Sequence, residues 1–182
     1  LPDVDLRIQT SDRDLDLVGE GIPLGVRGGY PTDWPACQTE VLAPERIYPV
    51  CSAAHLDRFG PVDGPRDLLD LPLIHLEEPF RSATTWQDWF AAQGIAASSV
   101  PRGLQINDYV LVVQSVIEGQ GIALGWDHLI EGLVRKRVLA RLTRQVLATG
   151  KDFHVIWPRA VPLSQPAAKV RDWLLDQRTP SA

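Results

Sequence analysis

Extended and helical segments alternate along this chain, and that alternation restricts its possible folds more than any other feature. Residues 3–9 alternate polar and apolar side chains with a period of two, which is typical of a strand with one buried face. Capping and helical signals follow over residues 11–22, and another extended segment covers 24–27. Because the connection between these two strands is long enough for a parallel crossover, the pattern predicts an α/β fold.

The same alternation continues to the end of the chain, where Gly, Pro and capping residues delimit each segment. We expect further strands over residues 39–42, 46–50, 73–76, 103–106, 122–125 and 153–157. We expect helices over residues 52–59, 85–93, 110–117 and 129–133, and from 164 onward. Ala43-Pro44 should interrupt the extended region, and such a break favours a change of lobe.

The segment 110–117 is apolar on nearly every side. A helix with one solvated face would be expected to carry charge on that face. We therefore expect this helix to be buried, either in a core or in a subunit interface.

Charge and hydropathy exclude several classes of function. The 182 residues include 23 acidic and 18 basic side chains, which gives a formal net charge of -5. Bulk electrostatic attraction to a polyphosphate is therefore not expected. No apolar stretch has the length of a membrane helix, and the N-terminus lacks a signal pattern, so we expect a cytoplasmic protein. The absence of methionine suggests a piece of a longer chain.

The chemically versatile side chains form no recognisable catalytic, cofactor or metal pattern. We expect structural or surface roles for the four histidines: His55, His75, His128 and His154. Glu77-Glu78 is open to two interpretations, an acid/base pair or solvated loop carboxylates. The basic run Arg135–Arg137 is more typical of a solvated edge than of a nucleic-acid site, as are the nearby arginines, Arg141 and Arg144. Cys37 and Cys51 fit buried thiols in a reducing compartment, with a redox switch as the alternative.

Three spaced motifs resemble LysR-type transcriptional regulators. They are "DVDLRIQTSDRDLDLVGEGIPLGVRGG" at 3–29, "ERIYPVCSAAHL" at 45–56 and "VVQSVIEGQGIALGW" at 112–126. The resemblance covers essentially the whole chain and concerns the regulatory domain. It is greatest to the subgroup that contains regulators of glycine cleavage and of β-lactamase induction.

The resemblance implies a two-lobed fold like that of type II periplasmic binding proteins. Each lobe would contain a mixed, mainly parallel sheet flanked by helices, and two crossover strands would join the lobes. The first lobe would comprise residues 1–45 plus 149–182, without the family's first strand and helix, and the second lobe 46–148. A winged helix-turn-helix that binds DNA would precede the chain in the complete protein.

The resemblance also implies where a ligand would bind. Effectors in such folds are held between the lobes at strand ends and helix N-termini, where free amides suit carboxylates. The corresponding positions in this chain are Thr10, Ser11, Arg27, Gly28, Asn107, Asp108, Tyr109 and Trp126. Capping is the alternative for Ser11 and Asp108. Trp126 and Tyr109 could also box a quaternary ammonium group.

The function that the resemblance implies is effector sensing in a bacterial LysR-type transcription factor. A small carboxylate or amino-acid-like metabolite would favour one lobe arrangement, and a homodimer or homotetramer would transmit that preference to DNA. The alternative is a solute-binding protein of a transport system on the same fold. An enzyme on this scaffold would require clustered acid, base or nucleophilic groups, which the sequence does not reveal.

Overall fold

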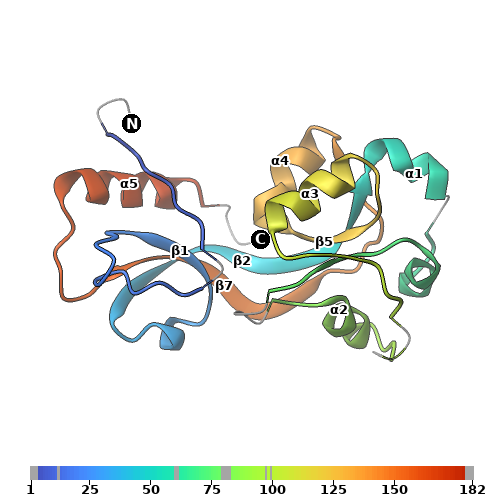
Figure 1. Cartoon of the computed structure of the whole chain (residues 1–182), viewed down its shortest axis with the longest axis horizontal. Helices are drawn as coiled ribbons and strands as arrows, with labels where there is room; N and C mark the ends of the chain where they lie inside the picture. The colour runs from blue at the N-terminus through green and yellow to red at the C-terminus, as the bar shows by residue number, and fades with distance from the viewer. Residues whose placement is uncertain are drawn as a thin grey trace. The chain divides into compact units, whose positions relative to one another are not determined.

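A computed structural model describes residues 4–11, 13–59, 62–78, 83–96, 98 and 100–178, without the side chains of 57–59. The predicted α/β class is confirmed (Figure 1). The strands are β1 (Gly25–Gly29), β2 (Cys37–Ser52), β3 (Ile74–Leu76), β4 (Leu104–Ile106), β5 (Ala123–Trp126), β6 (Leu139–Arg141) and β7 (Leu147–Pro158). The α-helices are α1 (Ala53–Phe59), α2 (Trp86–Ala92), α3 (Tyr109–Ile117), α4 (Asp127–Arg135) and α5 (Gln165–Asp176). Two 3-10 helices are η1 (Pro31–Asp33) and η2 (Pro65–Asp70).

The chain packs into two compact units. Unit 1 contains Leu1–Glu45 and Ala148–Ala182, and unit 2 contains Arg46–Leu147. In unit 1, β1 pairs antiparallel with β7, which neighbours β2, and the buried side chains of Leu17, Trp34 and Ile156 form a core cluster. The C-terminal helix α5 begins at the cap Ser164 and buries Ala167 and Val170.

Unit 2 positions the site described below. Its β5 and β6 pair antiparallel with β2, while β3 and β4 form a parallel pair. A parallel bridge between Leu73 and Ile122 connects the segments that precede β3 and β5. In Figure 1, α3 and α4 lie on one side of these strands and α2 on the other. The core contains these buried side chains: Tyr48, Val50, Ile74, Val112, Val116, Ala123, Ile130 and Leu139.

The expected strand over residues 3–9 is wrong, and so is the helix over 11–22. Residues 4–10 pair with no strand in the described part of the chain, and Ile8 is 80% exposed. Asp3 and Asp12 lie outside the described residues. A single turn over residues 17–21 replaces the helix, and it buries Leu17 against Trp34 and Ile156. An alternating pattern forms a strand only where a neighbouring strand supplies hydrogen-bond partners.

Three further expectations also require correction. The sheets are not mainly parallel, because the β1–β7, β2–β5 and β2–β6 pairs are antiparallel, whereas the β3–β4 pair is parallel. The parallel crossover expected at the N-terminus is absent from the described residues because its first strand does not form. In addition, β2 continues through Pro44 without a break. An extended backbone accommodates the fixed φ of proline, and only the hydrogen bond from its nitrogen is lost.

Candidate functional site

A pocket of about 170 Å³ lies in unit 2, where β3 and β5 end and α2 begins. This volume is smaller than the roughly 300–1,000 Å³ of typical ligand pockets, so it suits only a small molecule. Apolar and polar side chains both contribute to its lining: Ile74, His75, Leu76, Glu77, Thr84, Thr85, Trp86, Gln87, Gln105, Val112, Leu124 and Trp126. Such a combination of an apolar surface and a few polar groups is typical of ligand sites.

The start of α2 is fixed by a capping box, and this box positions one rim of the pocket. The Thr85 hydroxyl accepts a hydrogen bond from the Asp88 amide at 3.2 Å, and the Asp88 carboxylate accepts one from the Thr85 amide at 2.8 Å. The indole of Trp86 donates to the Ile74 carbonyl at 2.9 Å. These contacts attach α2 to β3, so Thr84 and Thr85 are held beside the end of β3.

Of the residues predicted to bind a ligand, Trp126 lines this pocket, and it is only 5% exposed. Its backbone amide donates to the Tyr109 hydroxyl at 3.0 Å. The two rings meet edge to face, with centroids 5.1 Å apart and planes at 83°. Tyr109 packs against the core of unit 2, and its burial raises the pKa of its hydroxyl. The rings therefore do not form two facing walls for an ammonium group, and Tyr109 instead positions Trp126.

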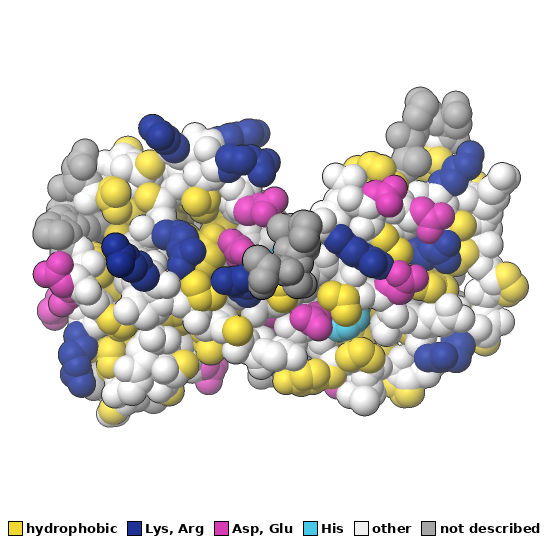
Figure 2. All heavy atoms as spheres, turned by 180° about the vertical axis from the view of Figure 1, so that it is seen from behind, with side chains coloured by type: hydrophobic (Ala, Val, Ile, Leu, Met, Phe, Trp, Pro, Cys, Tyr) yellow, Lys and Arg dark blue, Asp and Glu magenta, His cyan; other side chains and the backbone are white. Residues whose placement is uncertain are grey.

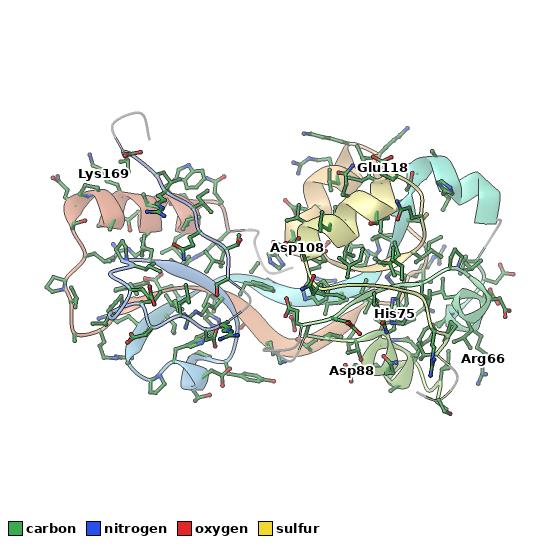
Figure 3. The ribbon with its side chains drawn as sticks, viewed as in Figure 1. Arg66, His75, Asp88, Asp108, Glu118 and Lys169 are labelled. Atoms are coloured by element: carbon green, nitrogen blue, oxygen red, sulfur yellow. The ribbon has the colours of Figure 1, made fainter. Side chains whose placement is uncertain are left out.

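His75 places a titratable ring at the pocket (Figure 3). Its Nε2 atom is buried and has no hydrogen-bond partner. Burial lowers the pKa of His75, while a hydrogen bond with the Pro101 backbone and the charge of Glu77 act in the opposite direction. The neutral ring can accept or donate a hydrogen bond toward a bound molecule, depending on its tautomer.

Asp108 caps α3 and does not line the pocket. Its Oδ1 atom accepts hydrogen bonds from the amides of Val110 at 2.8 Å and Leu111 at 3.1 Å. Figure 3 shows Asp108 at the start of this helix. The observed contacts of Asp108 are therefore those of a helix N-cap, which was the alternative to ligand binding. Asn107 is exposed on the preceding bend and is also absent from the lining.

The four predicted residues of unit 1 do not line this pocket. Arg27 donates a hydrogen bond to the Leu15 carbonyl and lies 3.6 Å from the Asp14 carboxylate, and its side chain is 11% exposed. Gly28 lies within β1 rather than in a turn after it. Ser11 accepts a hydrogen bond from the Arg13 amide at 3.1 Å, and Thr10 is exposed.

Most of the polar pocket residues were not predicted as ligand-binding. Glu77 follows a predicted strand, and Thr85 belongs to a recognisable capping pattern, so both carried a local signal. His75, Thr84 and Gln105 carried none. Their proximity depends on how β3, β4 and the segment before α2 pack together.

The described residues provide little support for other types of site. They contain no group of three or more His, Cys, Asp or Glu side chains that could hold a metal ion. In the same part of the chain, no helix is both long and apolar enough to cross a membrane. On the face shown in Figure 2, basic side chains are interspersed with acidic, hydrophobic and uncharged ones. Arg135, within the basic run, lies 3.9 Å from the Glu131 carboxylate.

Comparison with known proteins identifies one family. The family model described as LysR substrate binding domain matches residues 1–179. The glycine cleavage system transcriptional activator of Escherichia coli K12 is 27% identical over 174 residues, which cover 96% of this chain and 55% of that protein. The transcriptional activator AmpR of Rhodobacter capsulatus is 26% identical over 176 residues, covering 97% and 57% respectively. The chain thus spans just over half the length of these curated relatives.

Solved structures show the same fold. The effector-binding domain of Citrobacter freundii with three substitutions has a TM-score of 0.76 and 20% identity, covering 96% of this chain and 84% of that one. The effector domain of AmpR from Pseudomonas aeruginosa has a TM-score of 0.73 and 21% identity, with coverages of 97% and 82%. These likenesses confirm the expected class of fold.

Proposed function

The chain belongs to the LysR substrate-binding domain family, and we propose that it senses a small-molecule effector within a LysR-type transcriptional regulator. The observation that carries this proposal is the mixed polar and apolar pocket of unit 2, in a chain that the family model matches over residues 1–179. The relatives reported above are transcriptional activators, which supports this proposal over a solute-binding protein of a transport system.

We propose that the effector is a small amino-acid-like metabolite. The Glu77 carboxylate suits an ammonium group, whereas Thr84 and Gln105 provide donors for a carboxylate. Leu124 and Trp126 provide apolar surface for the rest of the molecule. This combination agrees with the carboxylate or amino-acid-like effector expected from the resemblance.

In this proposal, the residues predicted to bind the ligand have different roles. Trp126 contacts the effector, while Tyr109 and Asp108 position the segments beside it. Ligand binding by the other predicted residues remains a proposal, because none of them lines the pocket: Thr10, Ser11, Arg27, Gly28 and Asn107.

We further propose that α3 contributes to a homo-oligomer interface. Val110 and Leu111 are 71% and 56% exposed, whereas Val112 and Val116 of the same helix are buried. The apolar helix therefore meets the core with one face and presents large aliphatic side chains on another, as a subunit interface requires. DNA binding would belong to a helix-turn-helix elsewhere in a cytoplasmic regulator.

A thermal-shift screen tests the effector proposal. The chain would be mixed separately with each standard amino acid, with choline and betaine, and with acetate and succinate. We expect at least one amino acid to raise the melting temperature with increasing concentration, because binding to the folded state stabilises it.

The variant Gln105→Leu should reduce this stabilisation, because it removes an amide from the pocket. Gln120→Leu is the matched control, because Gln120 is exposed and lies outside the pocket lining. The proposal fails if no amino acid stabilises the chain, or if both variants respond as the original chain does.

A further inference from the structure

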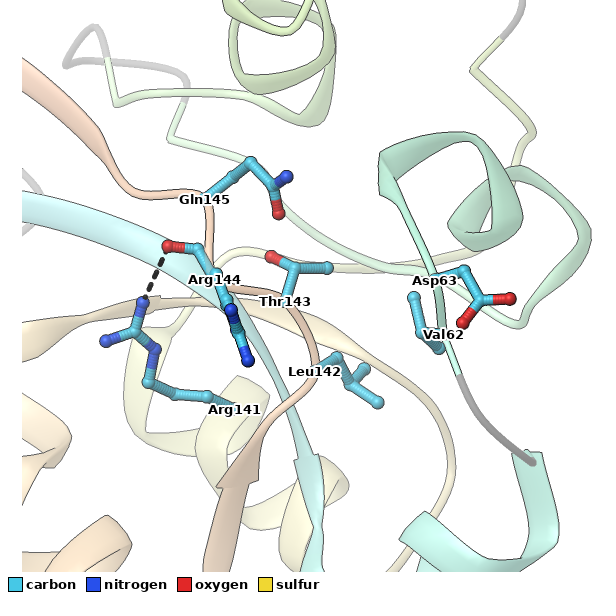
Figure 4. A pocket seen from close by; sticks show the side chains of 7 residues that line it. All are labelled: Val62, Asp63, Arg141, Leu142, Thr143, Arg144 and Gln145. Atoms are coloured by element: carbon cyan, nitrogen blue, oxygen red, sulfur yellow. Dashed lines mark hydrogen bonds between the residues drawn. The ribbon is translucent and has the colours of Figure 1, made fainter.

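A second pocket of unit 2 contains two guanidinium groups and has a different character from the effector pocket. It is open, has a volume of about 790 Å³, and is lined by Val62, Asp63, Arg141, Leu142, Thr143, Arg144 and Gln145 (Figure 4). None of these residues lines the pocket near Trp126. Five of the seven come from the consecutive segment that ends β6 and leads toward β7.

That segment is held in place by contacts at its start. The Leu142 amide donates to the Pro49 carbonyl of β2 at 3.1 Å. The Arg141 guanidinium lies 4.1 Å from the centroid of the Tyr48 ring, and it donates a hydrogen bond to the Arg144 carbonyl at 3.3 Å. One guanidinium is therefore oriented before any ligand binds, which lowers the entropic cost of binding.

The polar groups at this pocket favour a negatively charged occupant. Among the described residues, no carboxylate lies within ion-pair distance of Arg141 or Arg144. The Thr143 hydroxyl oxygen is buried and lacks a hydrogen-bond partner. In Figure 4 the carboxylate of Asp63 points away from the segment that carries the arginines. A hydroxyl buried without a partner destabilises a protein unless something satisfies it.

We propose that this pocket binds a small anion, either a phosphate or a carboxylate. The guanidinium groups of Arg141 and Arg144 would hold the anion by charge-assisted hydrogen bonds, and the Thr143 hydroxyl would donate a third bond. Both anions share this chemistry, because each presents oxygen acceptors to a planar guanidinium fork. The site is separate from the proposed effector pocket and does not depend on that proposal.

Nuclear magnetic resonance titration of the whole chain tests the proposal. Sodium phosphate and sodium acetate would be added in separate series at constant ionic strength. We expect saturable shifts of the backbone amides of residues 141–145 with at least one of the two anions, and the more effective one identifies the preferred chemistry.

Substitutions distinguish anion binding in this pocket from general attraction of anions to positive charge. Arg144→Gln should weaken binding about tenfold, because a hydrogen bond to a charged group is lost. Arg135→Gln, which removes the same charge from an exposed side chain of α4, should leave binding unchanged. Thr143→Val should weaken binding without lowering the melting temperature, since the hydroxyl has no partner in the anion-free chain.

Three results would overturn the proposal. The first is shifts that never saturate with either anion. The second is equal weakening by Arg144→Gln and Arg135→Gln. The third is a response of residues 141–145 to a DNA duplex but to neither small anion, which would assign the arginines to a nucleic-acid contact.

Discussion

Trp126 is the residue at which the core and the effector pocket of unit 2 meet. Its backbone belongs to β5 opposite Ile47 of β2, and its ring lines the pocket. The hydrogen bond from its amide to the Tyr109 hydroxyl joins the end of β5 to the start of α3. A change at either aromatic residue would therefore alter the shape of the pocket as well as the packing of the core.

His75 provides a prediction at the residue scale. In the unfolded chain its pKa has the ordinary value of about 6.5. In the folded chain burial lowers that pKa, so the unfolded state takes up the proton first as the pH falls. The free energy of unfolding should therefore decrease as the pH falls through about 6.5.

The variant His75→Asn removes this contribution. Urea denaturation at about pH 7.5 and about pH 5.5 should show a smaller decrease in the free energy of unfolding for the variant than for the original chain. Equal decreases in the two proteins would contradict the assignment of a lowered pKa to His75.

At the scale of elements, local signals predicted α1 to α5, but they also predicted a helix over residues 11–22 that does not form. The capping box at Thr85 and the caps at Asp108 and Ser164 are present as the sequence indicated. These signals succeed because a cap and its amides lie within a few residues of each other. The strand predicted at 3–9 failed because strand formation depends on a partner that its own residues do not specify.

The cap of α3 provides a prediction at this scale. Asp108→Ala removes the acceptor for the amides of Val110 and Leu111, and it should lower the free energy of unfolding by about 1 kcal/mol. Asp108→Asn should retain most of the stability, because an amide oxygen also caps helices well. Urea denaturation measures both, and an alanine variant as stable as the original chain would show that the cap contributes little.

At the scale of the whole molecule, the three spaced motifs predicted the family, and the comparison over residues 1–179 confirms it. The pocket of unit 2 could not be predicted in the same way. Its residues come from β3, α2, β4, α3 and β5, which are distant in sequence and meet only after packing. Sequence patterns describe local structure, whereas the pocket depends on how these elements lie against each other.

The central claim is that an amino-acid-like effector binds beside Trp126. The most direct test follows the indole N–H signals of the tryptophans while each standard amino acid is added to the chain. Trp126→Phe assigns the relevant signal, and Trp173, which is 46% exposed on α5 of unit 1, serves as an internal reference. We predict that at least one amino acid shifts the Trp126 signal to saturation and leaves the Trp173 signal in place. A Trp126 signal that no amino acid moves more than that of Trp173 would contradict the account.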